Sequence, residues 1–131
     1  MALKYSVTVR NARLDAIETT VGTSAILKIR TGAPPANCAA ADSGTVLSTV
    51  NLPSDWMAAA GAGVKAMTGS WTGTASGGAA ATPTHFRIKQ SATCHLQGTA
   101  GIGSGECQVN GTITSGQTVT VSSFQITAAN T

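Results

Sequence analysis

The chain has 131 residues and a formal net charge of +3 at pH 7, and only 10% of its residues are charged. This length fits one domain with a core of its own, while the scattered basic residues and the glycine-broken apolar stretches argue against specific nucleic-acid binding and against a membrane span. Because soluble domains carry roughly 25% charged residues, the low charge favours a surface partly hidden in an assembly; the alternative is a soluble β domain covered by Ser and Thr hydroxyls.

The first element predicted along the chain is a helix over residues 7–20, with Gly22 as its C-terminal stop. Three apolar residues recur at positions i, i+3 and i+7, a spacing that places them on one helix face: Leu14, Ile17 and Val21. We therefore divide the chain into an N-terminal helical segment, residues 1–22, and a β-sandwich domain, residues 23–131. The helix is available either for contact with a partner or for packing on its own domain.

After Gly22 the apolar pattern changes from a helical period to alternation, which is typical of β-strands. Turn residues interrupt the alternation, and residues 76–81 are predicted to be a flexible loop. Strands are predicted at residues 25–30, 45–50, 63–68, 70–75, 84–89, 93–99, 106–110 and 118–128. About eight short strands after one helix indicate a mainly β fold, and we expect a jelly-roll-like β-sandwich rather than a series of βαβ units.

The cysteines are three in number: Cys38, Cys94 and Cys107. An odd number argues against a dedicated disulfide framework, and the first residues lead into a polar segment rather than into a secretion signal. We therefore expect synthesis in a reducing cytoplasm with all three thiols free. A pair between Cys94 and Cys107 on neighbouring strands stays open.

Residues that carry catalysis are few, and the candidate bases are His85 and His95. Each lies in the middle of a predicted strand on the side opposite the apolar residues, so we expect surface or interface histidines. Cys94 and His95 are adjacent and point to opposite faces of a strand, which disfavours a zinc site. The run of glycines at 101–105 does not match a nucleotide-binding loop. The sequence predicts no enzyme, no metal and no cofactor.

The two tryptophans receive different interpretations. Trp71 lies in a predicted strand and is expected in the core, whereas Trp56 is expected at the edge of the core as a lid. The alternative makes Trp56 and its neighbour Met57 an assembly contact, because tryptophan is enriched at interface hot spots. Together with two apolar residues of the helix, this gives a set of four predicted interface residues: Leu14, Ile17, Trp56 and Met57.

Six segments follow one another along nearly the whole chain: NARLDAIE at 11–18, LKIRTGAPP at 27–35, LPSDWM at 52–57, HFRI at 85–88, TCHLQG at 93–98 and VTVSSFQI at 119–126. This series resembles small virion proteins of tailed bacteriophages, and it is similar to the capsid cement (decoration) proteins of that group. The segments contain no chemically diagnostic motif, and the resemblance brings no catalytic residue to any position of this chain.

The resemblance implies a jelly-roll-like β domain on the outside of a shell of major capsid protein, where it bridges neighbouring capsomers against internal DNA pressure. The expected partners are the major capsid protein and further copies of the chain, as a dimer first and a trimer second. The expected location is the exterior of the virion capsid, after synthesis in the cytoplasm of a bacterial host.

Three other functions are considered. The first is a tail, baseplate or fibre component of the virion. The second, from a different class, is a carbohydrate-binding β-sandwich module, which needs an exposed aromatic platform; Trp56 and Tyr5 are the residues available for it. The third and least favoured is a small hydrolase that uses His85 or His95.

Overall fold

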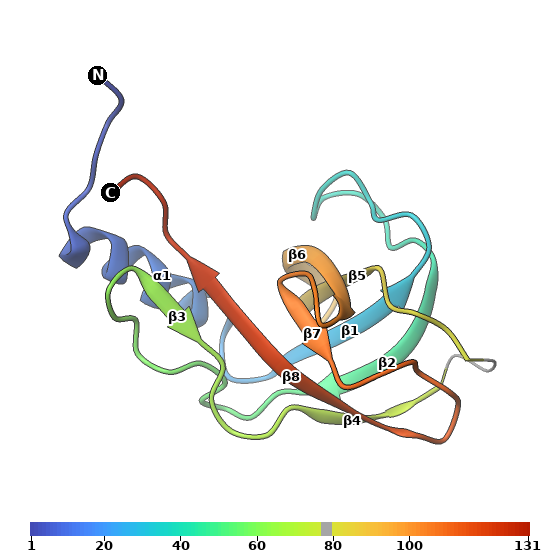
Figure 1. The fold of residues 1–131 in the computed structure, drawn as a ribbon. Helices are drawn as coiled ribbons and strands as arrows, with labels where there is room; N and C mark the ends of the chain where they lie inside the picture. Colours follow the sequence, from blue (N-terminus) through green and yellow to red (C-terminus); the bar gives the residue numbers. More distant parts are fainter. Residues whose placement is uncertain (77–79) are drawn as a thin grey trace.

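In a computed structural model, which describes residues 1–76 and 80–131, the chain forms a helix followed by a β-barrel (Figure 1). Helix α1 spans Val7–Val21. The strands are β1 Ala25–Thr31, β2 Thr45–Asn51, β3 Val64–Ala66, β4 Thr72–Ala75, β5 His85–Gln90, β6 Thr93–Ile102, β7 Cys107–Val109 and β8 Thr118–Thr127. The prediction of a mainly β fold with one N-terminal helix and about eight strands is confirmed. Within the predicted flexible loop 76–81, residues 77–79 lie outside the described residues.

Seven strands close into a barrel in the order β8-β4-β2-β1-β5-β6-β7, with β7 pairing back to β8. All of these neighbours are antiparallel except β6 and β7, which are parallel. The long strand β8 closes the barrel because it has three different partners along its length. It pairs with β4 at residues 118–120, with β7 at residues 121–124, and with β3 at residues 125–127.

An aromatic cluster fills the centre of the barrel. The Trp71 ring centroid lies 6.0 Å from that of Trp56 and 5.1 Å from that of Phe124, and Phe86 meets Phe124 edge to face at 5.4 Å. Trp56 Nε1 donates a hydrogen bond to the carbonyl oxygen of Gly22 at 3.1 Å, which satisfies its one polar group inside the core. The cluster joins the segment before β3 and the residue before β4 to strands β5 and β8 of the barrel.

Ser6 caps the N-terminus of helix α1, because its hydroxyl accepts a hydrogen bond from the backbone N–H of Val9. Gly22 caps the C-terminus with a φ of 94°, a conformation that suits glycine. The helix packs on its own domain. Lys65 of β3 is buried and reaches two carboxylates on α1, with its Nζ 2.8 Å from Asp15 Oδ1 and 2.9 Å from Glu18 Oε2. These ion pairs fix the helix against β3.

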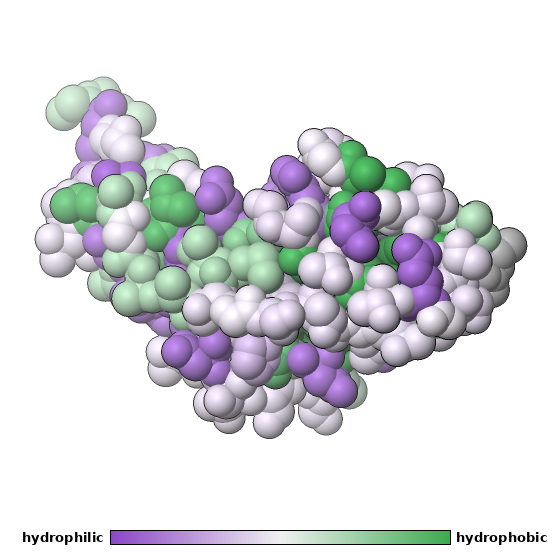
Figure 2. Space-filling model, turned by 60° about the horizontal axis from the view of Figure 1, so that its bottom comes forward, coloured by the Kyte–Doolittle hydropathy of each residue, from purple (hydrophilic) through white to green (hydrophobic). Residues whose placement is uncertain are grey.

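The surface is weakly polar. Figure 2 shows a mostly pale face on which strongly hydrophilic residues form separate spots. Many of the few charges face one another instead of water, since two clusters of ion pairs contain seven of the thirteen charged residues: Asp15, Glu18 and Lys65 in one, and Arg30, Asp42, Arg87 and Lys89 in the other. The charge that faces solvent is therefore even lower than the composition indicates.

Replacement of Trp71 by alanine tests the role of the aromatic cluster. Trp71 is fully buried, so Trp71→Ala leaves a cavity, and we expect the free energy of unfolding to fall by about 3–5 kcal/mol. Urea denaturation followed by circular dichroism measures this change. The matched control is Ile102→Ala, because Ile102 is 44% exposed and its loss should cost less than about 1 kcal/mol. Equal losses in the two variants would contradict a core built on Trp71.

Candidate functional site

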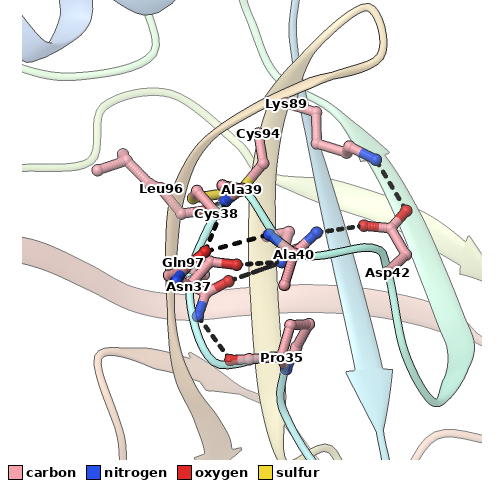
Figure 3. The surroundings of a disulfide bond; sticks show 11 residues. Pro35, Asn37, Cys38, Ala39, Ala40, Asp42, Lys89, Cys94, Leu96 and Gln97 are labelled. Atoms are coloured by element: carbon pink, nitrogen blue, oxygen red, sulfur yellow. Dashed lines mark hydrogen bonds and ion pairs between the residues drawn. A yellow bond between two sulfur atoms is a disulfide. The ribbon is translucent and has the colours of Figure 1, made fainter.

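The loop between β1 and β2, residues 32–44, folds back over strands β5 and β6. A disulfide bond between Cys38 of this loop and Cys94 of β6 holds it there (Figure 3), with the two Cα atoms 5.2 Å apart. Gln97 of β6 adds a second attachment, since its Nε2 donates to the carbonyl oxygen of Pro35 at 2.9 Å. The loop is therefore part of the rigid body of the barrel.

The disulfide corrects the expectation of three free thiols, and it also excludes a bond between Cys94 and Cys107, because Cys107 is free and buried. Cys38 and Cys94 are 56 residues apart in the sequence. The folded β1–β2 loop brings their Cα atoms within the 4.4–6.8 Å that a disulfide requires. Burial raises the pKa of the Cys107 thiol to about 12, so this cysteine is unreactive as a nucleophile.

The carboxylate of Asp42, which belongs to this loop, forms ion pairs with three basic side chains. Asp42 lies 2.7 Å from Arg87 Nη1, 3.0 Å from Arg30 Nη2 and 2.8 Å from Lys89 Nζ. Arg87 is 2% exposed, and its remaining donors reach Gln97 Oε1 and the carbonyl oxygen of Asn37. We name these four charged residues, Arg30, Asp42, Arg87 and Lys89, the loop cluster.

The loop cluster keeps Asp42 ionised. The hydrogen bond from Lys89 is the largest cause of a lowered pKa at Asp42. Together with Arg87 and Arg30, and against a partial burial that raises it, this bond brings the pKa to about 2. At neutral pH the carboxylate is therefore charged and holds the loop over the two arginines. Its role in the folded chain is to stabilise a buried positive charge.

His85 and His95 lie in different surroundings. His85 is buried, which corrects the expectation of a surface or interface histidine: the strand face opposite Phe86 is covered by the 32–44 loop. Burial lowers the pKa of His85, and the nearby Arg30 and Arg87 lower it further, so the imidazole is neutral at pH 7. His95 is half-buried and lines a shallow hollow beside α1.

Among residues 1–76 and 80–131, no group of three or more His, Cys, Asp or Glu side chains is placed to hold a metal ion. In the same residues, no helix has the length and apolar character needed to cross a membrane.

The four predicted interface residues lie mostly inside the chain. Leu14, Trp56 and Met57 are at most 2% exposed, and Ile17 is half-buried against the core. A partner could reach the first three only if the core opened, so the expectation that they form an interface is corrected. Their physical role is to join α1 to the barrel, since the backbone N–H of Met57 donates to Glu18 Oε1 at 3.0 Å.

A groove that no sequence pattern predicted lies between β6, β7 and the end of β8. Its volume is about 590 Å³. The floor is apolar and consists of Phe86, Leu96, Phe124 and Ile126, and the rim is mainly polar and consists of Gln97, Glu106, Gln108, Ser123, Gln125 and Thr127. No sequence signal marks this groove, because strands far apart in the chain form its two sides.

Comparisons of the chain with protein-family models, with curated proteins and with solved structures found no match.

Replacement of Asp42 tests the loop cluster. The pKa of Asp42 in the folded chain, about 2, lies below its ordinary value of 3.8, so its carboxylate stabilises the fold above about pH 4, and this contribution is lost as the pH falls towards 2. We expect Asp42→Asn to lower the free energy of unfolding at pH 7 by about 1–2 kcal/mol, a figure reduced for solvent screening because the carboxylate is partly exposed.

The measurement is urea denaturation at several pH values between 2 and 7, and Asp42→Asn should also flatten the acid dependence. Asp55→Asn is the matched control, because Asp55 is exposed and forms none of the ion pairs found in the described residues. An Asp42→Asn variant as stable as the Asp55→Asn variant would contradict the role of the cluster.

Loss of the disulfide should destabilise the fold strongly. The bond joins residues 56 apart, and closing a loop of this size in the unfolded chain is worth about 4 kcal/mol on chain-entropy grounds. We expect a reductant to lower the melting temperature of the natural chain and to leave that of a Cys38→Ser, Cys94→Ser double variant unchanged. Thermal denaturation with and without reductant checks this. An equal effect of reductant on both proteins would show that the bond does not form.

Proposed function

We propose that the chain is a structural protein of a tailed-bacteriophage virion, which binds the outside of the capsid, cements neighbouring capsomers of the major capsid protein and has no catalytic activity. The observation that carries the proposal is the set of exposed apolar side chains at the N-terminal end of the molecule. Val7 and Val9 are 45% and 44% exposed. Exposed apolar side chains next to a surface with little charge favour lasting contact with another protein.

The disulfide and the ion pairs that stiffen the barrel support the same proposal. A cement protein has to transmit force between capsomers without deforming, and here a disulfide and two clusters of ion pairs tie the long loop and the helix to the strands. Disulfide bonds persist in oxidising surroundings, which suits a particle that has left its host cell. Many copies of one modest contact stabilise a shell through multivalency.

The proposal includes two finer assignments. The closed barrel of short, mostly antiparallel strands is compatible with the jelly-roll-like β-sandwich class, to which we assign it. Within residues 1–22 we propose that Val9, in the first turn of α1, faces the major capsid protein, and that residues 23–131 form the rigid body above it.

The carbohydrate-binding alternative gains no support from the two aromatic residues considered for it. Trp56 is fully buried, and the guanidinium of Arg13 lies over the ring of Tyr5, 4.9 Å from its centroid. Trp56 therefore has no open face on which a sugar could stack, and one face of the Tyr5 ring is already occupied.

Particles assembled with and without this chain test the proposal. We expect particles that lack it to lose DNA at a lower temperature, and we expect quantitative mass spectrometry to find it in numbers close to those of the capsomers. Equal heat survival would overturn the cementing role. A copy number of only a few per particle, matching tail symmetry, would assign the chain to the tail or baseplate instead.

A matched pair of variants tests the contact itself. Val9→Asp adds a charge to the proposed capsid contact, and we expect it to reduce the occupancy of purified particles at least about tenfold, which is 1.4 kcal/mol of binding. Thr8→Asp adds the same charge at the neighbouring exposed position and should bind nearly as well as the natural chain. Equal occupancy of both variants would show that Val9 does not face the capsid.

A further inference from the structure

The barrel has a gap beside β7. Strand β7 lies between β6 and β8 but has only three residues, and it pairs with β6 at residues 100–102 and with β8 at residues 121–124. Ahead of Cys107 the chain turns away through Gly103 and Gly105, both at positive φ. In the described part of the chain, residues 93–98 of β6 and 125–127 of β8 therefore have a strand partner on one edge only. The gap is one strand wide and has an open strand edge on each side.

The groove of about 590 Å³ occupies this gap. One group of the β6 edge is already satisfied, since the Glu106 carboxylate accepts hydrogen bonds from the backbone N–H of Thr99, at 2.8 Å, and from its hydroxyl. The rest of the edge offers backbone donors and acceptors above an apolar floor that includes Leu96 and Ile126. Open edges with an apolar floor are the features by which a sheet accepts an added strand. We name this gap the strand slot.

The N-terminal arm, residues 1–4, has the complementary features. Figure 1 shows it projecting from the start of α1, beyond the body of the molecule. Its base is fixed, because the backbone N–H of Tyr5 donates to the carbonyl oxygen of Asn130 at 2.8 Å. In an extended arm, alternate side chains point to opposite sides, so Met1 and Leu3 form an apolar side and Ala2 and Lys4 the other. Met1 and Leu3 are both exposed.

We propose that the N-terminal arm of one copy of this chain occupies the strand slot of a second copy as an added strand. Four extended residues span about 13 Å and the six residues of the open β6 edge span about 20 Å, so the arm fits within the slot. Leu3 then packs on the apolar floor, and Lys4 lies at the rim that carries Glu106, the carboxylate of the slot. The fixed base at Tyr5 directs the arm away from its own barrel, so the slot it fills belongs to another copy.

Reciprocal exchange of two arms gives a dimer with two-fold symmetry. The exchange also repairs both barrels, because each slot gains the strand that β7 is too short to supply. The association concerns copies of this chain alone, so it does not depend on which particle carries the protein, and its test is separate from the heat survival of particles.

Disulfide trapping between two differently tagged copies tests the pairing. One copy carries Lys4→Cys in the arm and the other Ser123→Cys on the exposed rim of the slot, because both side chains lie on the rim side. We expect a disulfide-bonded heterodimer after oxidation of the mixture, with the two engineered cysteines identified by mass spectrometry. Ser115→Cys replaces Ser123→Cys in the control, because Ser115 is exposed but lies outside the lining of the slot. A yield no higher than in this control overturns the proposal.

A chain that carries both Lys4→Cys and Ser123→Cys tests which copy supplies the arm. At high dilution we expect it to remain without the engineered bond. A bond formed within one chain under these conditions would show that the arm fills its own slot, and this would overturn exchange between copies.

Self-association in solution gives an independent measurement. We expect sedimentation experiments to show Leu3→Asp weakening the association of the natural chain at least tenfold, because a charge would lie on the apolar floor. Leu3→Met keeps an apolar side chain and should associate like the natural chain. Circular dichroism checks that both variants keep the fold. Equal association of the two variants, or a natural chain that stays monomeric at every concentration, would overturn the proposal.

Discussion

Arg87 lies in the middle of β5 with 2% of its surface exposed, and a buried guanidinium is tolerated only while a carboxylate stays within hydrogen-bond distance. Asp42 supplies that carboxylate from the 32–44 loop at 2.7 Å. The loop must therefore lie over β5 and β6, and this position brings Cys38 to Cys94 and buries His85. One charge requirement thus sets the course of a loop, the partner of a cysteine and the environment of a histidine.

The ion pairs also show where the few charged residues of this chain lie. The chain has few charges, and more than half of them form ion pairs with one another inside two clusters. Their contribution is to fix the loop and the helix, and they add little to the solubility of the surface. What faces solvent is mostly small and hydroxyl-bearing, with exposed apolar side chains at the N-terminal end. This distribution is the reason why we propose that the protein functions as part of an assembly. In such an assembly the contact energy is summed over many copies.

The barrel closes through only three residues of β7, and this leaves a gap beside them. Strand β6 has ten residues and β8 has ten, but β7 between them has three. Two long strands that share a short neighbour leave their remaining edges open, and open edges in natural proteins are usually covered. The projecting arm of a second copy is a cover that the chain itself can supply. The open slot does not weaken the rest of the barrel. The disulfide and the ion pairs that stiffen the molecule lie elsewhere, at the 32–44 loop and at α1.

The sequence by itself determined the order of elements. Alternation and turn residues placed all eight strands, and the 3.6-residue period with Gly22 placed the helix, because these signals act between near neighbours in the chain. The tertiary structure decided what those elements face. Burial of Trp56 and His85, the bond between Cys38 and Cys94, and the groove beside β7 all depend on segments far apart in the sequence. Sequence periodicity shows which side chains share a strand face, but only packing shows whether a loop, a helix or water covers that face.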